Sequence, residues 1–78
     1  MTSARHKPMR GDSVVLREVP SGLLGGLPEE DQRAICEIVG KPVLLNQYDY
    51  EGRAELEFTD SDGTTHFIYV SPDLIKFV

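Results

Sequence analysis

The chain has few of the residues that could stabilise so small a fold through covalent or metal cross-links. It is 78 residues long and holds one cysteine, Cys36, two histidines and no tryptophan. A single cysteine excludes an internal disulfide, and without a Cys/His array nothing indicates a structural metal. A chain of this length forms at most one domain, near the size at which one hydrophobic core is barely sufficient. Its stability must therefore come from burial of the apolar residues, which make up 40% of the sequence.

Long apolar runs are also missing. No segment reaches the roughly 20 consecutive apolar residues that a membrane-spanning helix needs. The first residues, Met1–Pro8, contain no apolar stretch typical of a secretory signal. We therefore expect no membrane contact and a cytoplasmic location, and the single cysteine agrees with a reducing compartment.

Positive charge is scarce outside the N-terminal segment. The chain carries 8 Lys and Arg against 13 Asp and Glu, and Arg5, Lys7 and Arg10 all lie in residues 1–10, which hold no acid. We expect residues 1–10 to form a disordered basic tail and residues 11–78 a single acidic domain. An acidic body disfavours contacts with nucleic-acid phosphates, which need Lys or Arg. Because the basic tail could still supply such contacts, nucleic-acid binding by a small barrel that uses this tail is the alternative function.

The second half of the chain has the clearest pattern. Three runs with β-propensity cover residues 42–48, 53–59 and 65–70, and tight turns at Glu51-Gly52 and Asp62-Gly63 join them. An Asp-Gly pair between two such runs is among the strongest hairpin signals. The runs predict a three-stranded antiparallel meander. Simple alternation along the first run places Val43 and Leu45 on one face, and Leu44, Asn46 and Tyr48 on the other. In the second run, Ala54, Leu56 and Phe58 face inward, while Glu55 and Glu57 face water.

One helix is predicted between a first strand at residues 13–19 and the meander. Pro28 suits the first helical position, and the acids that follow it suit the positive end of the helix dipole. Gly40 suits the left-handed residue that follows a helix. The apolar residues recur at helical spacing and form one stripe: Leu27, Ala34, Ile35, Ile38 and Val39. A helix of about three turns can cover one face or one mouth of a small sheet, but not both.

Residues 72–75 predict a single helical turn, and a last short strand follows at residues 76–78. The resulting order of elements resembles that of the SH3-like small barrels, in which a one-turn 3₁₀ helix leads from the fourth strand into the fifth. Residues 11–16 and 70–75 carry this likeness. It implies a mostly β fold with one helix: a five-stranded SH3-like barrel whose helix is inserted between strands 1 and 2. Because such barrels serve many functions, the likeness implies a shape and not an activity.

No reaction centre is recognisable in the sequence. Residues 60–63 could be a fragment of a calcium loop, but the following residues supply none of the further oxygen ligands, so a β-turn is predicted. His66 is predicted to be a hydrogen-bonded histidine at the sheet margin. Neighbouring acids disfavour a thiolate at Cys36, which argues against a Cys36–His66 catalytic pair. We expect a protein that is not an enzyme, with no catalytic residue, metal or cofactor.

The aromatic residues are the candidate partner-binding residues. Some must belong to the core, but one helix cannot shield the whole sheet, so others should remain exposed. Tyrosine is a frequent interface anchor because it combines apolar area with a polar group. The candidates are Tyr48, Tyr50, Phe67 and Tyr69, and the acids beside them are Asp49, Glu51, Glu55 and Glu57. This acidic rim favours a basic partner. The sequence thus predicts a non-catalytic module that binds a protein or peptide, which can also be a second copy in a homodimer.

Overall fold

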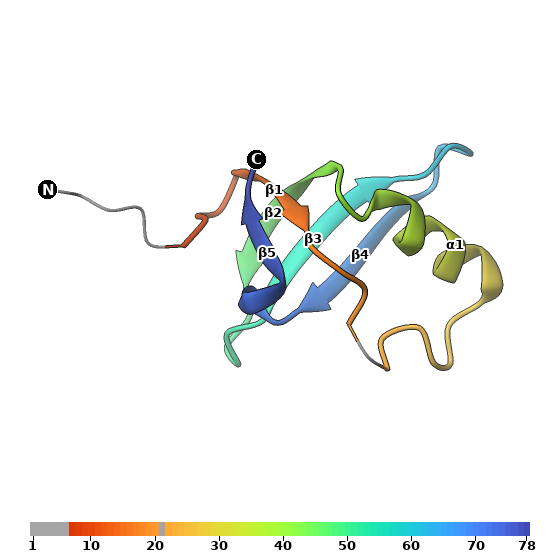
Figure 1. The fold of residues 1–78 in the computed structure, drawn as a ribbon, viewed down its shortest axis with the longest axis horizontal. Helices are drawn as coiled ribbons and strands as arrows, with labels where there is room; N and C mark the ends of the chain where they lie inside the picture. Colours follow the sequence, from red (N-terminus) through yellow and green to blue (C-terminus); the bar gives the residue numbers. More distant parts are fainter. Residues whose placement is uncertain (1–6, 21) are drawn as a thin grey trace, which may run out of the picture.

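The computed structural model describes residues 7–20 and 22–78, which form an antiparallel β-sheet of five strands with one helix. Figure 1 shows the elements in chain order: β1 (Ser13–Leu16), α1 (Glu29–Ile38), β2 (Pro42–Tyr48), β3 (Ala54–Thr59), β4 (Thr65–Val70), the 3₁₀ turn η1 (Pro72–Leu74) and β5 (Ile75–Phe77). The predicted mostly β class, with the helix between the first and second strands, is confirmed. In the described part of the chain, no helix is both long enough and apolar enough to cross a membrane.

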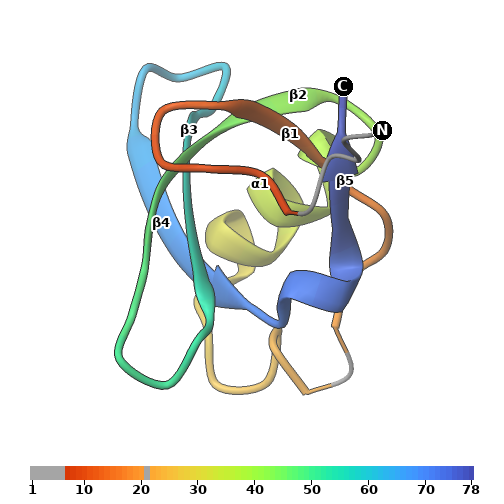
Figure 2. The same ribbon diagram turned by 90° about the vertical axis from the view of Figure 1, so that its left-hand side faces the viewer.

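The sheet is strongly curved but is not a closed barrel. Its strand order is β4-β3-β2-β1-β5, and all neighbouring strands are antiparallel. Within residues 7–20 and 22–78, β4 and β5 do not pair with each other, so each forms an edge of the sheet. The helix α1 lies at one end of the concave side, beside the β3–β4 hairpin (Figures 1 and 2). The expected closure of the barrel by strand pairing is therefore not observed.

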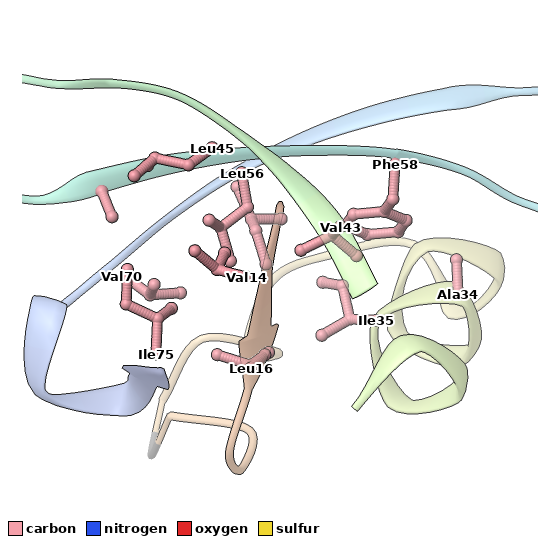
Figure 3. Packing of buried hydrophobic residues seen from close by; sticks show 12 residues of the cluster. Val14, Leu16, Ala34, Ile35, Val43, Leu45, Leu56, Phe58, Val70 and Ile75 are labelled. Atoms are coloured by element: carbon pink, nitrogen blue, oxygen red, sulfur yellow. The ribbon is translucent and has the colours of Figure 1, made fainter. Parts of the chain in front are cut away.

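The hydrophobic core fills the concave side of the sheet. Figure 3 shows Ile35 reaching from α1 toward Val43 of β2. The largest fully buried side chains come from β1, α1, β2 and β3: Val14, Leu16, Ile35, Leu45 and Leu56. Both hairpin turns use a glycine with positive φ, Gly52 at 85° and Gly63 at 86°, as the turn motifs predict.

One irregularity in β2 decides which side chains reach the core. Leu45 pairs with Leu56, but Gln47 pairs with Glu55, so the register shifts at Asn46. This β-bulge places one extra residue in β2 and reverses the alternation that follows it. Tyr48 therefore lies opposite Ala54 on the core side, whereas simple alternation predicts that it shares a face with Leu44.

Candidate binding surface on the outer face and edge of the sheet

The structure does not bring the four predicted aromatic residues together. Phe67 and Tyr69 project from the convex outer face of β4, with 54% and 44% of their surface exposed. Tyr50 lies in the β2–β3 hairpin and is 96% exposed. Tyr48, because of the bulge, is half-buried at the end of the opposite, concave face. Two of the four thus share one surface.

Tyr48 fastens the segment that precedes β1. Its hydroxyl donates a hydrogen bond to the Pro8 carbonyl at 2.6 Å, and the Lys7 ammonium lies 4.1 Å from the centroid of its ring. Burial, with the nearby Asp12 carboxylate, raises the pKa of the Tyr48 phenol above 10.0. Part of the predicted basic tail, residues 7–10, thus packs on the domain, while Arg5 lies outside the described residues.

A row of exposed side chains crosses the outer face from β4 to β2. Phe67 lies opposite Glu57, and Glu57 lies opposite Leu44, which is 39% exposed. The next pair along β4 and β3 is Tyr69 with Glu55. We call these five residues the outer-face patch: apolar Leu44, Phe67 and Tyr69, separated by the carboxylates of Glu55 and Glu57. Leu44 was not among the sequence candidates, although its alternation with Val43 and Leu45 already indicated that it faces outward.

The carboxylates of the patch are held by the side-chain amides that the bulge places over them. Gln47 Nε2 donates to Glu55 at 2.9 Å, and Asn46 Nδ2 donates to Glu57 at 2.9 Å and more weakly to Glu55 at 3.4 Å. Glu55 is only 9% exposed, whereas the sequence predicts that it faces water. Two consecutive amide side chains on one face are possible only because of the bulge. The acidic centre of the patch is therefore fixed in position.

Arg53 forms salt bridges with the two acids of the β2–β3 hairpin, Asp49 and Glu51. Arg53 Nε lies 2.7 Å from Asp49 and Nη2 lies 3.2 Å from Glu51, while the guanidinium lies 5.4 Å from the centroid of the Tyr69 ring. Burial alone raises the pKa of Asp49, but hydrogen bonds from the Arg53 backbone and side chain outweigh it and hold this pKa below 3.8. Of the predicted acidic rim, Glu55 and Glu57 thus remain without a cationic partner in the described part of the chain.

A groove runs beside the free edge of β4. Its walls are residues 64–68 on one side and Leu27, Asp31 and Ile35 on the other, and its volume is about 280 Å³. The groove separates β4 from α1 at the end of the sheet where the helix lies. It adjoins the outer-face patch because Phe67 belongs to both.

His66 connects β4 to the elements around it. Its Nε2 lies 2.7 Å from an Asp60 carboxylate oxygen, its Nδ1 lies 3.4 Å from Asp31, and its ring stacks on Phe58 at 5.2 Å between centroids. The predicted hydrogen-bonded histidine is confirmed. The hydrogen bond from His66, together with one from the Thr64 N–H, lowers the pKa of Asp60 below 3.8. These contacts tie together the β3–β4 turn, β4 and the first turn of α1.

The described residues do not assemble a recognisable catalytic or metal centre. Cys36 is exposed on α1, and no described contact joins it to His66. Residues 7–20 and 22–78 contain no group of three or more His, Cys, Asp or Glu side chains placed to hold a metal ion. The Asp60–Gly63 segment forms a turn, in which the Asp60 carboxylate accepts the N–H groups of Asp62 and Thr64 at 2.9 Å.

Comparisons of the chain with protein-family models, with curated proteins and with solved structures gave no significant match.

Proposed function

We propose that this protein is a small non-catalytic module that binds a protein or peptide through the outer-face patch. The observation that carries the proposal is the exposure of Phe67 and Tyr69, side by side on the outer face of an edge strand. Aromatic side chains dominate the binding energy of many interfaces, and a domain gains nothing in stability by leaving two of them in water. The exposed Leu44 extends the apolar part of this surface onto β2.

The charge of the patch supports a basic partner. Glu55 and Glu57 lie between the apolar side chains, and the chain as a whole carries a net charge of −5. Electrostatic complementarity selects partners and accelerates their association. A basic protein or peptide in the cytoplasm therefore fits this surface better than the phosphate backbone of a nucleic acid does.

The SH3-like relationship remains part of the proposal. The strand order, with η1 leading from β4 into β5, follows the order that the resemblance implies. In this domain, however, no strand of the described residues pairs with the outer edge of β4, which leaves that edge available for a partner.

A peptide display experiment tests the proposed function. A random peptide library is selected on the wild-type protein, and the selected peptides are measured against the double variant Phe67→Ala/Tyr69→Ala. We expect enrichment of basic peptides with apolar residues, and a loss of affinity of about tenfold or more, because truncation of one interface anchor costs about 2 kcal/mol.

The matched control is Met9→Ala, which also removes an exposed apolar side chain but lies outside the patch. Circular dichroism should show the wild-type spectrum for all variants. If no peptide is enriched, or if the enriched peptides bind all three proteins equally, the outer-face patch is not the binding surface.

A further inference from the structure

We infer that the partner binds as an added β-strand: an extended basic peptide pairs with the free edge of β4 and places an apolar side chain in the groove between β4 and α1. The inference rests on the proposed function and specifies the partner and its geometry.

The backbone groups of β4 point alternately toward β3 and toward the edge of the sheet. The Asp60 N–H donates to the Thr64 carbonyl at 2.9 Å, so these two residues form a hydrogen-bonded pair. Hydrogen-bonded and non-hydrogen-bonded pairs alternate along an antiparallel ladder. From Thr64 onward, even-numbered residues therefore bond to β3 and odd-numbered residues point away from it. The N–H and C=O groups of Phe67 and Tyr69 face the sheet edge, with which no strand of the described residues pairs.

The groove between β4 and α1 gives an added strand a place for its side chains. Side chains of a strand alternate between the two faces of a sheet. On the concave side, an added strand meets the groove, in which Leu27 is partly exposed and Ile35 and Ile68 are buried at the base. On the convex side, it meets Phe67 and Tyr69 of the outer-face patch. Strand addition combines backbone hydrogen bonds for affinity with such pockets for specificity.

The charge of the residues around β4 favours a basic peptide over a second copy of the chain. Asp31 lines the groove and Glu57 lies on the outer face beside Phe67, while His66 is the one basic side chain of the described residues that lines the groove. Pairing of β4 with β4 of a second copy would bring together two edges that carry the same excess of acids. Like charges brought together at an interface oppose association. A peptide that alternates lysine with Val or Ile instead places its apolar side chains toward the groove and its lysines on the convex face beside Glu57.

The test uses one defined probe, the fluorescein-labelled and end-capped peptide Lys-Val-Lys-Ile-Lys-Val-Lys, with fluorescence polarisation as the measurement. Two further peptides carry backbone N-methyl groups, either on the lysines or on the Val and Ile residues. Because alternate N–H groups of a strand point the same way, only one methylated set removes the hydrogen bonds to β4. We expect that set to weaken binding about tenfold or more, and the other set to bind like the parent peptide.

Amide hydrogen exchange reports the same geometry on the protein. In the free protein, the Phe67 and Tyr69 amides should exchange faster than those of Ile68 and Val70, and the parent peptide should protect the first two. The variant Glu57→Gln should bind the parent peptide several-fold more weakly, whereas Asp73→Asn, an exposed acid of η1 outside the outer-face patch, should not. The same peptide with glutamate in place of lysine should not bind.

Equal binding of both methylated peptides, or protection confined to residues outside β4, would overturn strand addition. Protection of the Phe67 and Tyr69 amides in a peptide-free dimer would overturn the choice of a basic peptide, because a second copy would then occupy the edge. These failures differ from failure of the proposed function. If peptides selected from the library need Phe67 and Tyr69 but tolerate both methylation patterns, the module binds its partner without strand addition.

Discussion

At the scale of single residues, the contact between His66 and Asp60 links acid–base chemistry to the stability of the fold. The two side chains lie 2.7 Å apart, and both are largely shielded from water. The Asp60 carboxylate also accepts two backbone N–H groups of its own turn. The ionised form of Asp60 is thus stabilised in the folded protein and not in the unfolded chain. Protonation of this group must therefore weaken the fold.

We predict that Asp60→Asn is less stable than the wild type at neutral pH and that the difference disappears in acid. The folded pKa of Asp60 lies below the ordinary value of 3.8 because of the hydrogen bond from His66 and those from the turn. A depressed carboxyl pKa contributes stability that is fully present above the unfolded pKa and is lost as pH falls through the folded pKa. Thermal melts of both proteins from pH 7 to pH 2 measure this difference.

The matched control is Asp62→Asn in the same turn, because the Asp62 side chain forms no hydrogen bond or ion pair within the described residues. Its melting temperature should stay close to that of the wild type at pH 7. Melting curves for Asp60→Asn that run parallel to those of the wild type down to pH 2 would contradict the role given to this carboxylate.

The residue-scale errors of the sequence interpretation share one cause. Alternation correctly placed Ala54, Leu56 and Phe58 in the core, because β3 is regular. It placed Tyr48 on the wrong face and predicted that Glu55 faces water. Both predictions are wrong because the bulge at Asn46 shifts the register of β2. A bulge depends on the fit between two strands that are distant in sequence until they pair, and no local motif at Asn46 signals it.

At the scale of secondary-structure elements, α1 is held to the sheet by a small contact. Its buried side chains are Ala34 and Ile35, and its first turn adds the Asp31–His66 contact of 3.4 Å. Isolated helices of this length are marginal in water, so packing must supply most of the stability of α1. Ile35 is the larger of these two buried side chains, and the partly buried Ile38 also packs against the core.

We predict that Ile35→Ala lowers the free energy of unfolding by about 3 kcal/mol, because it removes a fully buried aliphatic side chain and leaves a cavity. Glu37→Ala, an exposed position of the same helix, should change it by less than about 0.5 kcal/mol. Urea unfolding followed by circular dichroism measures both values. Similar losses in the two variants would mean that helix propensity, and not packing, holds α1.

The elements themselves were predictable from local sequence, but their closure was not. Gly52 and Gly63 mark the hairpins, and Pro28 with Gly40 brackets the helix, so each boundary has a local chemical cause. Whether β4 meets β5 depends on the curvature of the whole sheet and on the space that α1 takes. The groove beside β4 follows from that arrangement. The sequence therefore indicates that Leu27, Asp31 and Ile35 belong to the helix or flank it, but it does not indicate that they line a groove.

At the scale of the whole molecule, the edge strand β4 bears on self-association, because no strand of the described residues pairs with its outer edge. Exposed edge strands invite pairing with other copies, and charged side chains are a common protection against it. Here Glu57 lies beside Phe67, and the chain carries a net charge of −5. The homodimer expected from the sequence stays a prediction, and electrostatics decides the conditions under which it can form.

We predict that salt has opposite effects on self-association and on binding of the basic peptide. Added salt screens repulsion between acidic copies, so sedimentation at high protein concentration should show a monomer at 50 mM NaCl and more association at 1 M. The same screening removes the attraction to a lysine-rich strand, so the peptide affinity should fall over that range. A dimer at 50 mM NaCl that dissociates in 1 M would mean that attractive charge pairs join the copies. The acids around β4 would then not be what keeps this edge free for a basic partner.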